Sequence, residues 1–166
     1  MKQFTPKSVA LFTLSSGVMA LMMQACGGGG DAHAQAATPI DPIVGLWQSS
    51  VSLNNCSGVA VGGFRGLTTL QQGGTALADN NQPSATKGPA MGTWKAGATA
   101  GSYVVSLRFW RYLADGTPAG QQRLTRTITL SADGQSLTST ITTQALDNAD
   151  NVVQSACGTE TAARIG

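Results

Sequence analysis

The sequence predicts an all-β fold: about eight antiparallel strands in an up-and-down meander that closes into a barrel, after an N-terminal signal helix and a disordered tether. Apolar and polar residues alternate with a period of two along most of the chain beyond residue 42, and helical periodicity is not sustained. Turn signals rich in Gly, Asp and Asn separate these stretches. Sequential strands leave two open edges unless the last strand pairs with the first, which favours closure.

The strands are expected in order at residues 43–53, 59–70, 75–79, 89–97, 101–113, 119–131, 135–146 and 152–163. Alternation is clearest in 101–113, where Tyr103, Val105, Leu107 and Phe109 occupy one face. Threonines in the next two strands suit a pleated surface and disfavour a helix. Asp115-Gly116 and Asp133-Gly134 provide tight turns, and Asn80–Gly88, which contains a proline, is the longest predicted loop.

The first 25 residues have the layout of an export signal. Lys2 and Lys7 precede an apolar run over residues 8–23, which is shorter than the roughly 20 apolar residues of a transmembrane helix. The run ends in Leu21-Met22-Met23-Gln24-Ala25-Cys26, which resembles the lipobox of bacterial lipoproteins, although Met and Gln before Ala depart from its usual pattern. Ordinary secretion with cleavage after Ala34 is the alternative.

The lipobox resemblance implies that residues 1–25 are removed and that Cys26 becomes the lipid-carrying first residue of the mature chain. Several acyl chains hold a protein firmly to a bilayer, so the membrane is the expected partner. Gly27 is not the aspartate associated with inner-membrane retention, which favours the periplasmic face of the outer membrane. Residues 26–41 are then a lipidated flexible tether, and residues 42–166 form a single barrel domain.

Charge and cysteine content narrow the functional classes. Removal of the two lysines of the signal segment leaves eight of the ten basic residues and eight acidic ones, so the mature chain has a formal net charge of about zero. It therefore lacks the excess of basic residues that is typical of nucleic-acid-binding proteins. Cys56 and Cys157, in an oxidising compartment, are expected to form a disulfide, with two free thiols as the alternative. No metal site or cofactor is expected, because the single histidine, His33, lies in the tether.

The segment Gly45-Leu46-Trp47 matches the Gly-x-Trp motif of lipocalins, and the domain therefore resembles a lipocalin-like, calycin-type barrel. In that family the tryptophan closes one end of the barrel under a basic side chain from the last strand, so the resemblance implies that Arg164 covers Trp47. A second copy, Gly92-Thr93-Trp94, opens the fourth strand, and the family's Thr-Asp-Tyr turn is absent. Core packing is the alternative role of both tryptophans. A membrane-spanning barrel is disfavoured because aromatic residues are too few for two girdles.

Glu160 is the only glutamate and lies within the last strand. It is predicted to point inward toward Arg108 or Arg126, since Arg126 shares a face with Leu124 and Ile128. A buried charge needs such a partner. These three charged residues are therefore a candidate interior polar cluster: a register-fixing ion pair, an exposed pair, or the polar anchor of a ligand.

Trp110 and Tyr112 should lie on the face opposite Phe109. If that face is outward, they form a patch for a partner protein or glycan; if it is inward, they line a cavity. Alternation alone does not distinguish these cases.

We expect no catalytic residues in the domain. Its lack of histidine excludes Ser-His-Asp and Cys-His machinery, and a second inward acid for two-carboxylate hydrolysis is not visible. The expected function is a non-catalytic, membrane-tethered periplasmic module that binds a small apolar or amphipathic molecule. The alternatives are a structural or protein-interaction lipoprotein with a side-chain-filled barrel, and an isomerase or cyclase in which Glu160 is catalytic. The sequence does not indicate the oligomeric state.

Overall fold

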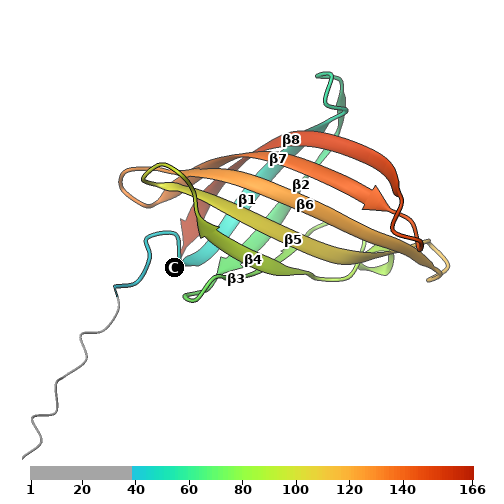
Figure 1. The fold of residues 1–166 in the computed structure, drawn as a ribbon, viewed down its shortest axis with the longest axis horizontal. Helices are drawn as coiled ribbons and strands as arrows, with labels where there is room; N and C mark the ends of the chain where they lie inside the picture. The colour runs from blue at the N-terminus through green and yellow to red at the C-terminus, as the bar shows by residue number, and fades with distance from the viewer. Residues whose placement is uncertain (1–38) are drawn as a thin grey trace, which may run out of the picture. The chain divides into compact units, whose positions relative to one another are not determined.

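Alternating side chains and tight turns fold residues 39–166, the part of the chain that the computed structural model describes, into eight antiparallel strands (Figure 1). The strands are β1 (Gly45–Asn54), β2 (Ala60–Leu70), β3 (Thr75–Asn80), β4 (Ala90–Ala96), β5 (Ser102–Tyr112), β6 (Pro118–Leu130), β7 (Ser136–Leu146) and β8 (Val152–Ile165). All eight predicted strands are present, with bounds within two residues of those expected. The predicted signal helix, Cys26 and most of the predicted tether lie outside the described residues.

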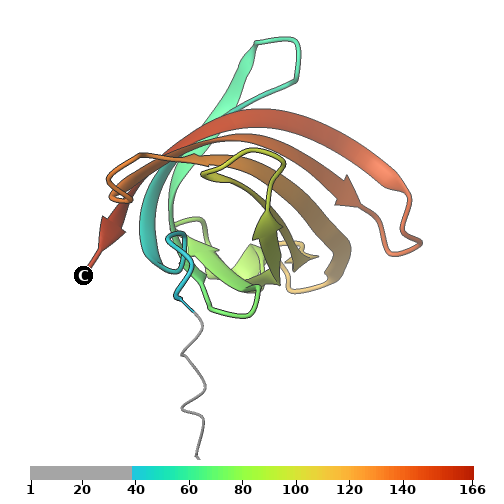
Figure 2. The same ribbon diagram turned by 60° about the vertical axis from the view of Figure 1, so that its left-hand side comes forward.

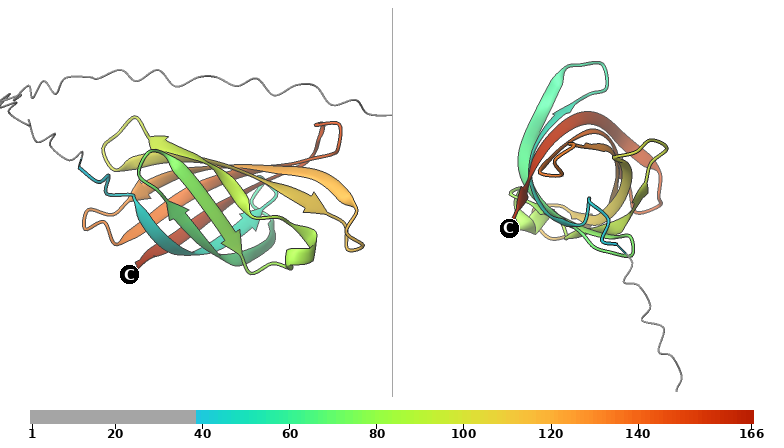
Figure 3. Two further views of the ribbon diagram at one scale, coloured as in Figure 1. Left: turned by 90° about the horizontal axis from the view of Figure 1, so that it is seen from below. Right: turned by 90° about the vertical axis from the view of Figure 1, so that its left-hand side faces the viewer.

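The strands follow one another in sequence order and close into a barrel, because β1 pairs antiparallel with both β2 and β8. The end-on view in Figure 3 shows the resulting ring. This confirms the predicted meander and its closure. Residues 38–166 form a compact unit with their own core, so the barrel is a folding unit in itself.

The barrel interior follows from the period-two alternation of the strands. On β5 the odd positions Tyr103, Val105 and Leu107 are buried, whereas the even positions Ser106 and Arg108 are exposed. The loop between β3 and β4 contains the short 3-10 helix η1 (Ser84–Thr86). No helix within residues 39–166 has the length and apolar character needed to cross a membrane.

Trp47 closes one end of the barrel. Its indole lies beneath the Arg164 guanidinium, whose carbon is 4.3 Å from the ring centroid, and its Nε1 donates to the carbonyl of Ile43 at 3.0 Å. Arg164 also donates to the carbonyls of Val44 at 2.7 Å and Gly134 at 2.9 Å. The first-strand register places Trp47 directly opposite Arg164. The closure implied by the Gly-x-Trp resemblance is therefore present in the geometry.

Gly45 has a specific reason to be glycine in this arrangement. A Cβ atom at this position would lie 2.3 Å from Nη1 of Arg164 and would displace the guanidinium, and the φ of +152° is one that L side chains rarely adopt. The glycine of the motif thus provides the space in which the arginine covers the tryptophan two residues later.

Asp41, the last residue of the predicted tether, also contacts this closed end. Its carboxylate accepts from the Tyr103 hydroxyl at 2.7 Å and from the Ile43 amide at 3.1 Å. Burial, followed by the hydrogen bond to Asp41, raises the pKa of Tyr103 to about 12. Trp94, from the second Gly-x-Trp segment, packs edge-on against Tyr103 with ring centroids 5.8 Å apart and donates to the Gln71 carbonyl. Its role is core packing.

The disulfide between Cys56 and Cys157 ties the loop of the β1–β2 hairpin to β8, with Cα atoms 4.8 Å apart. This hairpin projects beyond the barrel wall (Figure 2). The bond joins residues 101 positions apart in sequence and so closes most of the domain into one covalent loop. The predicted disulfide is confirmed.

Removal of this disulfide should lower the free energy of unfolding. In the double variant Cys56→Ser/Cys157→Ser we expect a loss of about 2–4 kcal/mol, because the unfolded chain regains the freedom that a long covalent loop denies it. Urea denaturation of oxidised, reduced and variant barrel measures the effect. Equal unfolding midpoints for the oxidised and reduced protein would show that the bond does not stabilise the fold.

Candidate functional site

A pocket of about 340 Å³ occupies the end of the barrel opposite Trp47. Its walls come from the late residues of β1, β3, β5 and β7 and the early residues of β2, β4 and β6, which meet at this end in an antiparallel barrel. The larger apolar wall residues are Leu53, Phe64, Phe109, Leu124 and Ile141. The other half of the interior is filled by the core that surrounds Trp47. The barrel is thus packed at one end and hollow at the other.

An ion pair forms the floor of the pocket. Arg126, from β6, lines the cavity and donates through Nη1 to Glu160 Oε1 on β8 at 3.1 Å and to Thr68 Oγ1 on β2 at 2.9 Å. The second carboxylate oxygen of Glu160 accepts from the Ser139 hydroxyl on β7 at 2.7 Å. Side-chain exposure is 8% for the arginine and 1% for the glutamate. The pair and its two hydroxyl partners therefore link four strands, β2, β6, β7 and β8, across the interior.

Arg126 keeps one donor without a partner. Its Nε atom is buried and has no hydrogen-bond partner among residues 39–166. An unpaired buried donor costs about 1–3 kcal/mol. Because this atom has almost no accessible surface, it is closed to the pocket as well, and other atoms of Arg126 line the floor.

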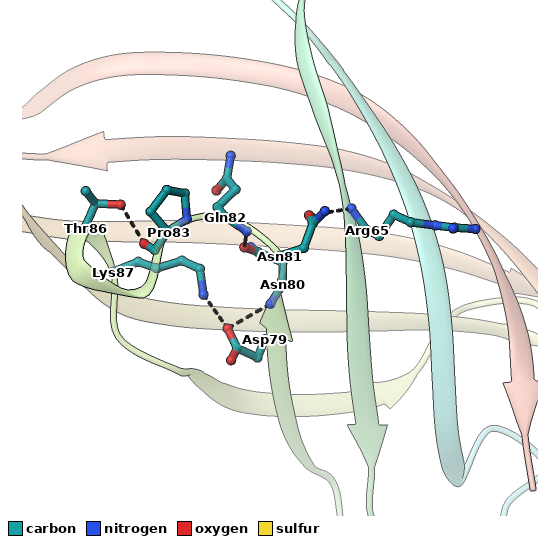
Figure 4. A network of polar contacts seen from close by, with 8 residues as sticks. All are labelled: Arg65, Asp79, Asn80, Asn81, Gln82, Pro83, Thr86 and Lys87. Atoms are coloured by element: carbon teal, nitrogen blue, oxygen red, sulfur yellow. Dashed lines mark hydrogen bonds and ion pairs between the residues drawn. The ribbon is translucent and has the colours of Figure 1, made fainter.

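The mouth of the pocket is polar. Lys87, in the β3–β4 loop, pairs with Asp79 on β3, and the Asn80 amide donates to the same carboxylate oxygen (Figure 4). The hydrogen bond from Lys87, and then that from Asn80, lowers the pKa of Asp79 below its ordinary value. Around them the Asn81 side chain accepts from the Arg65 amide, and the Thr86 hydroxyl donates to the Pro83 carbonyl. These contacts hold the loop in place at the rim.

Arg111 is the cation of the mouth that lacks an acidic partner. Its Nη1 donates a long hydrogen bond of 3.5 Å to the Ala119 carbonyl. It takes part in no ion pair within residues 39–166. Gln122 and Thr143, also at the mouth, are joined by a 2.6 Å hydrogen bond. The pocket thus presents one uncompensated positive charge near its opening.

The structure brings together two of the three residues of the predicted interior cluster. Glu160 and Arg126 form the buried pair, but Arg108 is exposed on the outer face, directly opposite Arg123 across β5 and β6. The prediction that included Arg108 is wrong, because this residue alternates with the inward-facing Leu107 and Phe109.

The predicted patch of Trp110 and Tyr112 is also divided. Trp110 is 55% exposed on the outer face, whereas Tyr112 is half-buried and lines the pocket. The β5–β6 register shifts between these two residues, so the period of two breaks there. The two aromatic side chains therefore do not form one surface.

Sequence reasoning missed Lys87, Arg111, Gln122 and Thr143 at the mouth. Lys87 lies in a loop and Arg111 beside an irregular register, where alternation gives no direction. Gln122 shares the inward parity of Leu124 and Arg126, and Thr143 shares that of Ile141, which was a usable signal. No group of three potential metal ligands occurs within the described part of the chain.

Replacement of Glu160 alone should destabilise the barrel more than replacement of the whole pair. Glu160→Leu leaves the buried Arg126 charge uncompensated, for which we expect a loss of about 3–5 kcal/mol in the free energy of unfolding. Arg126→Leu/Glu160→Leu removes both charges and should recover most of that loss. Urea denaturation of both single variants and the double variant measures the coupling energy between the two residues. A loss in the double variant equal to the sum of the two single losses would show that Arg126 and Glu160 do not stabilise each other.

Comparison with known proteins does not assign a family. No protein-family model, curated protein or solved structure matches the chain. The function proposed below therefore rests on the pocket and its residues.

Proposed function

We propose that this protein is a lipid-anchored envelope protein whose barrel binds a small amphipathic molecule without transforming it. The pocket carries this proposal: an open cavity of about 340 Å³ with apolar walls, a buried arginine at its floor and an unpaired cation at its mouth. Small-molecule sites in proteins are apolar cavities of about 300–1,000 Å³ with a few placed polar groups. A barrel filled throughout by side chains, the structural alternative, would not leave this space.

The size of the pocket sets the size of the ligand. At about 30 Å³ per water molecule in the liquid, the volume of 340 Å³ corresponds to roughly eleven waters, which suggests a ligand on the order of ten to fifteen non-hydrogen atoms. The aromatic ring of Phe109 and the aliphatic side chains of Leu124 and Ile141 favour an apolar body.

Charge balance favours a monoanion. Asp79 is neutralised by Lys87, and Arg126 by Glu160, whereas Arg111 has no acidic partner among residues 39–166. A ligand with one acidic group at the mouth end complements this remaining charge.

The surroundings of Glu160 support a non-catalytic barrel. Its two carboxylate oxygens accept from Arg126 and Ser139, and it does not belong to the residues that line the pocket. A catalytic acid or base must reach the reacting atoms, whereas this carboxylate is engaged behind the floor. The isomerase or cyclase alternative is therefore disfavoured.

The proposed location rests on the export signal. The lipobox-like segment that ends at Cys26 supports a lipid anchor, and the disulfide between Cys56 and Cys157 is consistent with an oxidising compartment. The proposed site is the periplasmic face of the outer membrane.

Decanoate, an apolar chain with one carboxylate, is the probe for the pocket, with decanol as its neutral counterpart. We expect the barrel to bind both and Arg111→Gln to weaken decanoate binding about tenfold, since a hydrogen bond to a charged group contributes about 1.5–3 kcal/mol. Isothermal titration calorimetry measures the affinities. Arg108→Gln, an outward arginine on the same strand, is the matched control and should bind as the wild type does.

Two outcomes separate the parts of this proposal. If neither probe binds, or if Ile141→Phe, which narrows the cavity, leaves their affinities unchanged, the pocket is not a binding site for such molecules. If both bind but Arg111→Gln has no effect, the ligand charge is not recognised at the mouth. Native mass spectrometry of the protein purified from its source then identifies the molecule it carries.

Fatty-acid labelling tests the anchor independently. Cells that express the full chain and are fed a radiolabelled fatty acid should produce a labelled protein, and Cys26→Ser should abolish the label, because the acylated thioether forms on that sulfur. An unlabelled wild-type protein would remove the anchor from the proposal and leave ligand binding unaffected.

A further inference from the structure

The outer surface of the barrel has two contrasting faces. Outward positions on β6, β7 and the middle of β8 are mostly hydroxyl-bearing and exposed: Thr125, Thr127, Thr129, Thr138, Thr140, Thr142, Thr159 and Thr161. The outer face of β2–β5 instead carries exposed large apolar side chains: Leu67, Leu77, Met91 and Trp110. A threonine-rich face interacts well with water, whereas a row of exposed apolar side chains is typical of a contact surface.

The strand register makes these four apolar side chains neighbours. Leu77 is directly opposite Met91, and Leu67 is opposite Asp79, two positions beyond Leu77. Met91 is in turn opposite Arg108, which lies two positions before Trp110 on the same face. The side chains therefore form one band across four strands, which we call the β2–β5 stripe.

Cations without acidic partners surround the stripe. Arg65, Lys95 and Arg108 are exposed on β2, β4 and β5, and none of them takes part in an ion pair within residues 39–166. The acid on this face, Asp79, is already paired with Lys87. Arg123 lies opposite Arg108 in the strand register, and its Nη2 is 3.9 Å from Oδ1 of Asp150. Arg65, Lys95 and Arg108 are therefore the cations of this face that lack an acidic partner among residues 39–166.

We propose that the β2–β5 stripe is a docking surface for an anionic phospholipid bilayer. Exposed apolar side chains that enter the headgroup region, a tryptophan at the interface and flanking cations are the features by which protein surfaces bind such bilayers. A protein partner would need matching acidic groups around an apolar contact, and the bilayer surface presents negative charge in every direction along the stripe. Charge complementarity therefore favours the bilayer.

The length of chain before the barrel makes a weak contact sufficient. Thirteen residue steps separate Cys26 from Pro39, so even a fully extended segment holds the barrel within about 45 Å of a lipid on Cys26. A tether of this length gives an effective concentration on the order of millimolar. This effective concentration depends on the lipid anchor of the proposed function, whereas the composition and placement of the stripe are independent of it.

Vesicle sedimentation of the barrel, residues 39–166, tests the stripe without the anchor. We expect binding to vesicles of equal parts phosphatidylglycerol and phosphatidylethanolamine, weaker binding to phosphatidylcholine vesicles, and loss of the difference at high salt. Ser106→Glu places a negative charge on this face, between Val104 and Arg108, and should weaken binding to the anionic vesicles roughly fivefold, at about 1 kcal/mol per charge. Thr140→Glu makes the same change in net charge on the threonine-rich face and should leave binding unchanged.

The apolar part of the stripe has its own variant. The double variant Leu77→Thr/Met91→Thr replaces two exposed apolar side chains by threonine, which is common on the opposite face and suited to strands. It should weaken binding to both kinds of vesicle. Far-ultraviolet circular dichroism and thermal melts show whether each variant is folded.

Three results would overturn the proposal: no binding to anionic vesicles, equal loss in Ser106→Glu and Thr140→Glu, or a dimer in sedimentation velocity that Leu77→Thr/Met91→Thr dissociates. The last result would assign the stripe to a second copy of this chain. None of these results changes the fatty-acid label on Cys26 or decanoate binding, so failure here is distinct from failure of the proposed function.

Discussion

The pairing of β1 with β8 is the constraint on which the rest of the structure depends. Without it both strands would be open edges, and the meander would be an open curled sheet. The same register places Trp47 opposite Arg164 and Val51 opposite Glu160. Because side chains alternate between faces, a slip of one residue would move Glu160 to the outer surface and remove the cover from Trp47. Closure, end packing and the pocket floor are therefore consequences of one register.

Arg126 and Glu160 then decide how much of the interior is filled. An eight-stranded barrel is just wide enough for its side chains to fill it or for one small ligand. On the Trp47 side of the pair, large apolar residues fill the space, whereas on the other side the walls leave a pocket. The long side chain of Arg126 spans the interior to reach Thr68 as well as Glu160. Its planar group has several donors, and Nη1 alone holds both partners.

Much of the fold could be predicted from alternation, and less of the site. The period of two located every strand and placed Arg126 and Glu160 inside, and the Gly-x-Trp resemblance implied the contact between Trp47 and Arg164. The same rule, applied strictly to Arg108, places it outside, where it lies. The side of Tyr112 depends on a register shift that leaves no mark in the sequence. The pocket depends on the combined side-chain volumes of seven strands, which cannot be predicted from any local sequence pattern.

The positions of the chain start, the stripe and the pocket give the proposed parts a common geometry. Residue 39 enters the barrel at its closed end, where Arg164 binds the carbonyls of Pro42 and Val44, so the proposed lipid anchor would attach at the end away from the mouth. An anchor alone would leave the pocket free to point into the aqueous phase. The proposed contact through the β2–β5 stripe would lay the barrel on its side, because the stripe crosses the strands on one flank. The mouth, with Arg111 at its rim, would then open along the bilayer surface, where amphipathic molecules concentrate with their polar groups at the headgroups and their apolar parts among the acyl chains. The proposed stripe contact would thus add what the proposed anchor alone would not: an orientation in which the pocket faces the phase that holds the proposed ligand.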